Sequence, residues 1–334
     1  MKKRILAMTA CLVFLLSGCG KQAQPPANAS DDKGDSLIVV GFSQVGAESE
    51  WRVANTESIK AALSEENGYE LIFDDGRNKP ENQIRAIRNF IQQGVDYIVF
   101  SPIVETGWNS ILQEAKDAGI PVIVIDRYIE SEENGLYTAY IGSDFRKEGE
   151  NAVQWLEKLM IKQGRTEDPI QIVDLQGTMG SSAQIGRTAA LEQAINRNAN
   201  WVMADQVCGD FTRAKAYEVM SEILTTSKDI DVVYCENDGM ALGAIDALEE
   251  AGLKCNADGG VIVISFDATR EGLKYCLDGR IALNVECNPL QGPYVDEIIK
   301  QLQNGDPIKQ EQYIEETQFD FLTVSQELID SRKY

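Results

Sequence analysis

The sequence predicts an α/β protein made of two doubly wound lobes, each with a parallel sheet covered by helices. Short runs rich in β-branched residues alternate with amphipathic segments of about ten to twenty residues, which is typical of βαβ units. This alternation occurs as two successive series along the chain. About 300 residues carry the pattern, more than one comfortable hydrophobic core accommodates, so two similar lobes are the economical division.

The expected strands follow one another in two groups of five. The first group covers residues 37–42, 69–73, 95–100, 121–126 and 136–142. The second group covers residues 170–175, 201–206, 231–235, 260–266 and 281–287. Between strands, apolar residues recur at helical spacing, as Ile84, Ile87 and Ile91 do, and each expected helix starts with a capping or acidic residue.

The first 18 residues have the features of a secretory signal peptide. Lys2, Lys3 and Arg4 precede an apolar run, residues 5–16, that is too short to span a bilayer. The run ends in Leu-Ser-Gly-Cys, which resembles the site at which bacterial lipoproteins are cut and then diacylated on the cysteine, here Cys19. An ordinary signal peptide with a chance cysteine is the alternative. Residues 19–36 are expected to form a polar, flexible tether that keeps the protein outside the cytoplasm at the membrane.

Composition excludes several classes of function. The net charge of −22, or −25 without residues 1–18, disfavours nucleic acid and anionic membrane surfaces as partners. The chain has no histidine, so a histidine-based catalytic triad or metal site is impossible, which counts against an enzyme. Five cysteines follow Cys19 without C-x-x-C spacing, so neither a disulfide framework nor a metal site is expected.

Polar and aromatic residues gather after the expected strands, where ligands bind in open α/β sheets. Six strand ends carry them, in both halves of the chain, and the strands themselves are almost wholly apolar. The candidate site residues are Glu48, Trp51, Arg52, Asp126, Arg127, Arg187, Phe211, Asn237 and Asp267.

Structural roles remain open for several of these residues. Trp51 suits a core position and Arg52 a solvated one, while Asp126 and Arg127 suit a surface turn and Asn237 suits a helix N-cap.

Two catalytic or cofactor roles have weaker support. The Gly-rich segment 176–187 lacks both the P-loop lysine and G-x-G-x-x-G, which argues against a nucleotide site and leaves no cofactor expected. Glu48, Asp126 and Asp267 include the residue type that glycoside hydrolysis needs, but nothing in the sequence fixes their separation.

A family resemblance covers nearly all of residues 37–330. The segments "GFSQVGAESEWR", "GIPVIVIDR", "LQGTMGSSAQIGR", "GDFTRAKAYEVM", "NDGMALGAI" and "ISFD" resemble, in that order, type I periplasmic sugar-binding proteins of ABC importers. Within the ribose- and galactose-binding group, the E-S-x-W-R start, Trp108 and the "GDFTR" segment are most similar to galactofuranose-binding proteins.

The resemblance implies a fold in which the chain crosses three times between its lobes. One lobe would contain residues 37–141 and 289–317, and the other residues 142–288 and 318–334. Trp51 would stack on a sugar face, Glu48 and Phe211 would complete the two sides of the cleft, and polar residues would bind the hydroxyl groups, namely Arg52, Asp126, Arg127, Arg187, Asn237 and Asp267. Cys287 stands where the ribose-binding group has glutamine, with Glu286 beside it as a substitute.

The function implied is capture of a monosaccharide, galactofuranose or a related galactose or pentose sugar, by a monomer that delivers it to an ABC permease. The alternative is a receptor that presents the sugar to a chemotaxis or two-component sensor. A sugar-responsive repressor would carry a basic helix-turn-helix in place of the signal segment. A glycoside hydrolase would turn over a chromogenic furanoside.

Overall fold

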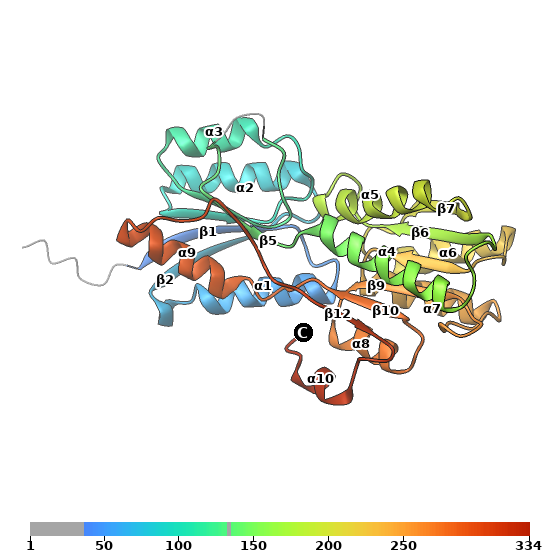
Figure 1. The fold of residues 1–334 in the computed structure, drawn as a ribbon. Helices are drawn as coiled ribbons and strands as arrows, with labels where there is room; N and C mark the ends of the chain where they lie inside the picture. The colour runs from blue at the N-terminus through green and yellow to red at the C-terminus, as the bar shows by residue number, and fades with distance from the viewer. Residues whose placement is uncertain (1–36, 132–134) are drawn as a thin grey trace, which may run out of the picture. The chain divides into compact units, whose positions relative to one another are not determined.

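The computed structural model describes residues 37–131 and 135–334, which form two six-stranded sheets with helices on both faces (Figure 1). The predicted fold class is therefore confirmed. The predicted signal peptide, the tether and Cys19 lie outside the described residues. Among the helices of the described ranges, none has the length and apolar composition needed to cross a membrane.

The first sheet, which defines the N-lobe, consists entirely of parallel pairs. Its strands are β1 (Ile38–Gln44), β2 (Tyr69–Asp75), β3 (Tyr97–Phe100), β4 (Val122–Asp126), β5 (Ala139–Gly142) and β11 (Glu311–Tyr313), in the order β11-β5-β4-β3-β1-β2. Side chains alternate between the faces, so Ile98 and Phe100 enter one core and Val99 the other. Because both faces are buried, the central strands are almost wholly apolar.

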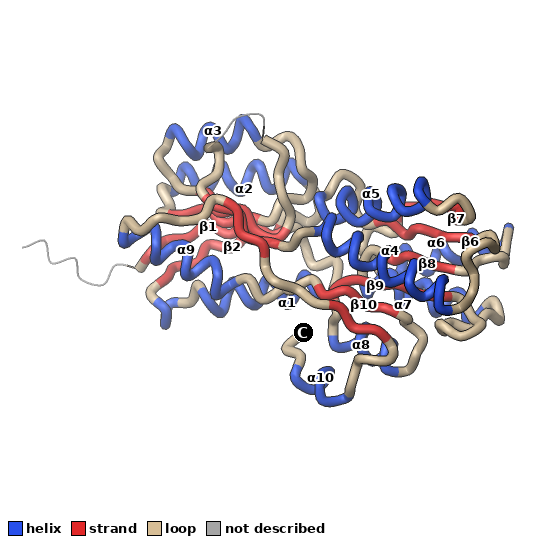
Figure 2. Tube along the Cα trace, in the orientation of Figure 1, coloured by secondary structure: helices blue, strands red, loops and turns tan. Residues whose placement is uncertain are grey.

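Helices cover both faces of the N-lobe sheet (Figure 2). Helices α2 (Pro80–Gln93) and α3 (Asn109–Asp117) pack on one face, and α1 (Glu50–Ala62) and α9 (Gly292–Asn304) on the other. A short 3₁₀ helix, η1 (Glu65–Asn67), precedes β2. Proline at the first position of α2 and Gly94 in left-handed conformation after it explain where that helix begins and ends.

The second sheet, which defines the C-lobe, is parallel except at one edge. Its strands are β6 (Ile170–Gln176), β7 (Trp201–Cys208), β8 (Val232–Cys235), β9 (Ile262–Asp267), β10 (Leu283–Glu286) and β12 (Gln318–Asp320), in the order β12-β10-β9-β8-β6-β7. Strand β12 pairs antiparallel with β10. All ten strands predicted from the sequence are present, with ends shifted by up to three residues.

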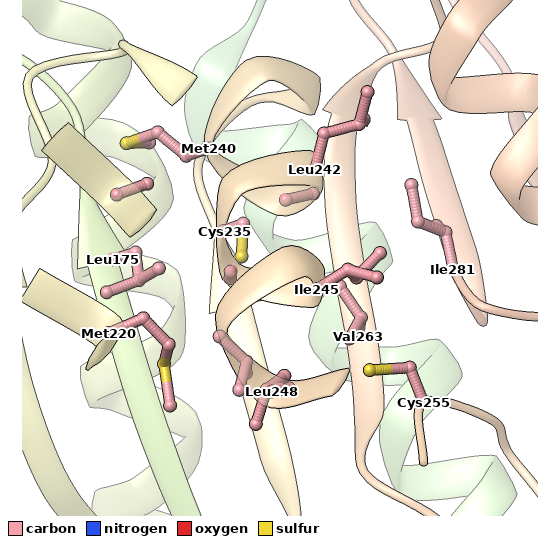
Figure 3. Packing of buried hydrophobic residues seen from close by; sticks show 14 of the residues in the cluster. Leu175, Met220, Cys235, Met240, Leu242, Ile245, Leu248, Cys255, Val263 and Ile281 are labelled. Atoms are coloured by element: carbon pink, nitrogen blue, oxygen red, sulfur yellow. The ribbon is translucent and has the colours of Figure 1, made fainter. Parts of the chain in front are cut away.

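Helices cover both faces of the C-lobe sheet. On one face lie α4 (Phe145–Lys162) and α5 (Ser182–Arg197). On the other lie α6 (Arg213–Thr226), α7 (Asp238–Glu250) and α8 (Arg270–Leu277), with α10 (Gln326–Ser331) against α8. Figure 3 shows part of this second core, where Ile245 and Leu248 of α7 pack toward Val263 of β9.

The chain passes between the two sheets three times. The first crossing joins β5 to α4, the second joins β10 to α9, and the third joins β11 to β12. Backbone hydrogen bonds link the crossings, from Ile314 N to Gly142 O at 2.9 Å and from Glu286 N to Thr317 O at 2.9 Å. The sequence did not predict β11 and β12, because each has only three residues and neither has an apolar run.

Candidate ligand-binding site

A pocket with a volume of about 30 Å³ lies between the lobes. All nine predicted site residues line it: Glu48, Trp51, Arg52, Asp126 and Arg127 from the N-lobe, and Arg187, Phe211, Asn237 and Asp267 from the C-lobe. Both lobes therefore contribute side chains to one pocket.

Arg52 is the centre of the N-lobe side of the pocket. Its guanidinium donates to Glu48 Oε1 at 2.9 Å and to Asp126 Oδ2 at 2.6 Å, and Ser101 Oγ also donates to Asp126 Oδ2, at 2.8 Å. Burial alone would lower the pKa of Arg52, but the charges of Asp126 and Glu48 outweigh it and raise that pKa. The alternative in which Arg52 is a solvated surface cation is wrong, since its side chain is buried.

Arg127 has weaker partners in the same pocket. It donates to the Ile103 carbonyl at 3.1 Å, while its distances to Glu48 Oε1 and Asp126 Oδ2 are 3.6 and 4.0 Å. Burial and the nearby charge of Arg52 lower the pKa of Arg127 to about 10. Glu48 Oε2 is also buried and has no hydrogen-bond partner among the described residues. A donor and an acceptor at the pocket thus remain incompletely bonded.

Arg187 occupies the corresponding position on the C-lobe side. Its Nε and Nη2 both lie 2.8 Å from Glu148 Oε2, its Nη1 donates to the Glu236 carbonyl, and its Nη2 is 4.0 Å from Asp267 Oδ1. Its guanidinium carbon also lies 4.7 Å from the centre of the Phe266 ring. These contacts fix the guanidinium plane, because its donors bind in a rigid fork.

The two other polar groups of the C-lobe differ in how fully they are bonded. Asn237 caps α7 by accepting from Met240 N at 2.9 Å, and it donates to the Phe211 carbonyl at 3.2 Å, so the N-cap prediction is confirmed. No group in residues 37–131 or 135–334 donates a hydrogen bond to the Asp267 carboxylate. Burial raises the pKa of Asp267 well above its usual value although Arg187 opposes this rise.

The two predicted aromatic residues, Trp51 and Phe211, also line the pocket. Trp51 lies at the start of α1, and its Nε1 donates to the Cys287 carbonyl of the second crossing at 2.6 Å. The Phe211 ring lies against Gly177, where an added Cβ would come 1.9 Å from the ring, and the Arg127 guanidinium lies 5.2 Å from the ring centre. Gly177 therefore makes room for the Phe211 ring. This packing role explains a glycine in segment 176–187 without a bound nucleotide phosphate.

Several residues at the pocket hold a strained backbone. Asp126, Phe211 and Asp267 have φ angles of 61°, 57° and 104°. Residues other than glycine rarely adopt positive φ, and each such conformation costs on the order of 1–3 kcal/mol. All three residues line the pocket, so part of the backbone strain of the molecule lies at the predicted site residues.

Four lining residues were not among the predicted site residues: Ser49, Phe145, Ala183 and Cys287. Ser49 caps α1 by accepting from Arg52 N, and Phe145 begins α4 directly after β5. The strand-end rule applied to β5 would have identified Phe145. Cys287 directly follows β10, so the same rule, together with its match to a glutamine of the ribose-binding group, could have identified it.

The described residues include one cluster of potential metal ligands, formed by Glu148, Cys287 and Glu316, whose ligand atoms lie within 4.8 Å of one another. Arg187 already pairs with Glu148, and Ser143 donates to Glu316 at 2.7 Å, so hydrogen bonds account for much of the cluster. The absence of a metal remains a prediction. The five described cysteines, Cys208, Cys235, Cys255, Cys276 and Cys287, are free thiols, in agreement with the expectation of no disulfide framework.

Two α/β lobes that contribute charged and aromatic groups to one shared pocket define a class of protein that encloses a ligand between its lobes. Residues 40–306 match a family model described as the periplasmic binding protein domain. The chain belongs to this periplasmic binding protein family.

Several proteins of known ligand are similar to this chain. The galactofuranose-binding protein YtfQ of Escherichia coli is 40% identical over 272 residues, which cover 80% of this chain and 83% of that protein. A Mycobacterium smegmatis protein solved with β-D-fucofuranose is 42% identical, with a TM-score of 0.81 and coverage of 86% and 93%. The binding protein of an arabinose ABC transporter from Shewanella sp. ANA-3, bound to L-arabinofuranose, is 39% identical, with a TM-score of 0.80 and coverage of 88% and 95%.

Proposed function

We propose that the protein captures a monosaccharide in its furanose form, galactofuranose or a related sugar, and delivers it to an ABC import permease. One observation carries the proposal: buried ionisable groups from both lobes face the same pocket without complete hydrogen bonding. These groups are Glu48 Oε2, the Arg127 guanidinium and the Asp267 carboxylate. The furanose ligands of all three similar proteins support the choice of sugar.

Sugar hydroxyl groups suit these incompletely bonded groups. A hydroxyl donates one hydrogen bond and accepts others, so it can satisfy a carboxylate and a guanidinium together. Bonds to charged partners contribute about 1.5–3 kcal/mol each, and a sugar that lacks the matching hydroxyl leaves a buried charge unpaired. We infer that Glu48, Arg127 and Asp267 discriminate among sugars, while Arg52, Asp126, Arg187 and Asn237 complete the polar wall of the site.

The aromatic residues suit the apolar faces of a sugar ring. Trp51 and Phe211 come from different lobes and line the same pocket. We infer that Trp51 stacks on one face of the ring and Phe211 closes the other side. An aromatic plate together with a guanidinium fork at the start of α1 would therefore serve both the C–H face and the hydroxyl edge of one ligand.

Lobe closure is the mechanism that connects binding to transport in this proposal. A ligand that contacts both lobes binds the closed state more tightly than the open state, and it therefore shifts the protein toward the closed state. The permease would bind that closed state. The lobes we propose comprise residues 37–141 with 289–317 and residues 142–288 with 318–334. The assignment of β11 to one sheet and β12 to the other supports the division in the third crossing.

The location and the wider role are also proposals. Family membership places the protein outside the cytoplasm, and we infer that a lipid on Cys19 holds it at the membrane as a monomer after residues 1–18 are removed. Because the similar proteins are binding proteins, we infer no catalytic reaction. A sensor partner is less supported than a permease, since one of the three is the binding component of an ABC transporter.

Calorimetric titration tests the proposal. The protein from residue 36 onward is unfolded and refolded to remove co-purified ligand, then titrated with galactofuranose, arabinofuranose, galactopyranose and ribose. We expect one-to-one saturable binding with a preference for furanoses. Binding of none of these sugars would overturn the proposal, and turnover of a chromogenic galactofuranoside would contradict a pure binding role.

A further inference from the structure

We propose that Glu316 is a positioning residue whose protonated carboxyl group donates to Glu148, holds Arg187 at the pocket and joins the three crossings between the lobes. The part that concerns ligand affinity rests on the proposed function. The part that concerns the proton is independent of it.

Glu316 contacts all three crossings. It lies on the third crossing, between β11 and β12. Its Oε1 accepts from Ser143 Oγ on the first crossing at 2.7 Å and from Asn288 N on the second at 2.6 Å. A single carboxyl group therefore binds together the segments whose backbone must rotate when the lobes separate.

The hydrogen-bond pattern determines which oxygen carries the proton. The two groups that donate to Glu316, Ser143 Oγ and Asn288 N, both bind its Oε1. Oε1 is therefore the acceptor oxygen, and Oε2 is left to carry the proton. In Glu148, Oε2 takes the bonds from Arg187, whereas Oε1 is buried and has no partner among conventional donors of the described chain. A proton on Glu316 Oε2 would give Glu148 Oε1 the partner it lacks, and the side chains of Glu148 and Glu316 lie close enough to share a hydrogen bond.

Electrostatics favours this shared proton. Atoms of the two carboxyl groups lie within 4.8 Å of each other, and two like charges so close in a buried site disfavour ionisation of one member. Burial and the charge of Glu148 raise the pKa of Glu316 to about 9. The charged and titratable groups that surround the pair include Asp144 and Lys147 beside Glu148, Arg187 of α5, Tyr140 of β5, Asp267 of β9, Glu286 of β10 and Cys287 after it.

These neighbours do not compensate an ionised Glu316. Lys147 is exposed, so solvent screens its charge, and Glu286 is paired with Arg332. Arg187 is bound to Glu148, and burial raises the pKa of the Cys287 thiol, which keeps it neutral. Loss of the proton would therefore place a second negative charge beside Glu148 and compete for Arg187, which would weaken the alignment of its guanidinium at the pocket.

The test compares Glu316→Gln, Glu316→Ala and the control Glu315→Gln, which changes the exposed neighbouring glutamate. Glutamine keeps the shape of a protonated glutamate and cannot ionise. Without ligand, thermal and chemical unfolding are followed from pH 5 to pH 8. The pKa of Glu316 is raised from 4.5 to about 9 in the folded protein. The protonated side chain therefore contributes stability at low pH, and this contribution is lost as pH rises toward 9. We expect the folding constant of Glu316→Gln, relative to wild type, to rise about tenfold per pH unit.

Infrared spectra and ligand affinity complete the test. At pH 7 the carboxylic-acid C=O absorption of the wild type should contain a component that Glu316→Gln lacks and Glu315→Gln retains. Glu316→Ala should bind sugar about tenfold more weakly, and Glu316→Gln should differ from wild type by less than about threefold at pH 7. A pH profile of Glu316→Gln parallel to wild type, together with no lost component of that absorption, would overturn the proposal. If the wild type binds no sugar, the proposed function fails while the ligand-free measurements still decide the protonation of Glu316.

Discussion

Removal of the Trp51 indole tests both sugar stacking and lobe closure. In Trp51→Ala, the loss of aromatic stacking on the sugar reduces the binding free energy by about 0.5–1.5 kcal/mol, in addition to the effect of the lost buried area. Loss of the Nε1 hydrogen bond to the Cys287 carbonyl, 2.6 Å long, contributes about 0.5–1.5 kcal/mol more. The sum, about 1–3 kcal/mol, weakens sugar binding by about 5- to 150-fold at 25 °C.

Trp51→Phe separates the two contributions. Phenylalanine keeps an aromatic face but cannot donate to Cys287 O. Since that bond joins the N-lobe helix α1 to the second crossing, we expect it to break when the lobes open. Its loss should weaken affinity by about 2- to 12-fold.

Trp108→Phe is the matched control. Trp108 Nε1 also donates to a main-chain carbonyl, Val104 O at 2.7 Å, but both residues belong to the N-lobe and Trp108 lies outside the pocket. Both phenylalanine variants should lose stability in thermal unfolding, whereas calorimetry should show weaker binding only for Trp51→Phe. Equal sugar affinities of wild type, Trp51→Ala and Trp51→Phe would refute the reasoning.

Three further perturbations have defined outcomes. Glu48→Gln removes the acceptor charge beside Arg52, and calorimetry should show an affinity loss of about 1.5–3 kcal/mol; unchanged affinity would exclude Glu48 from ligand contact. Gly177→Ala should displace the Phe211 ring and lower both melting temperature and affinity, whereas Gly164→Ala, in open space, should lower stability alone. Burial raises the pKa of Asp174 to about 7, so the contribution of Asp174 to wild-type stability falls as pH rises from about 4 to 7. Asp174→Asn should remove up to about 1.4 kcal/mol of that loss per pH unit in calorimetric unfolding, and an equal effect at pH 5 and pH 8 would contradict the assignment.

The predicted fold depended on strong local signals. Apolar runs such as residues 121–126 are buried on both faces of a sheet, so composition alone predicts them as strands. Strands β11 and β12 lack such a signal, because Glu311–Tyr313 and Gln318–Asp320 are polar edge strands that pair only through the tertiary structure.

Prediction of the site was limited in a different way. The strand-end rule placed Asp126 and Asp267 near one another in space, but the rule does not specify how they are bonded. Arg52 and Arg187 each have a buried carboxylate partner, and the partner of Arg187, Glu148, is absent from the predicted site residues. Its position in the amphipathic helix α4 gives no signal, since a glutamate there is usually solvated. Only the packing of α4 against α5 places Glu148 beside Arg187.

The order of the strands along the chain has a consequence for biosynthesis. Residues 311–320 supply an edge strand to both sheets, β11 beside β5 and β12 beside β10. Neither sheet is complete until these residues have left the ribosome. The pairing of β11 with β5 joins segments far apart in the sequence, which slows folding. Both sheets therefore lack an edge strand until nearly the whole chain has been synthesised. That delay would favour passage across a membrane as an unfolded chain and completion of both lobes on the far side.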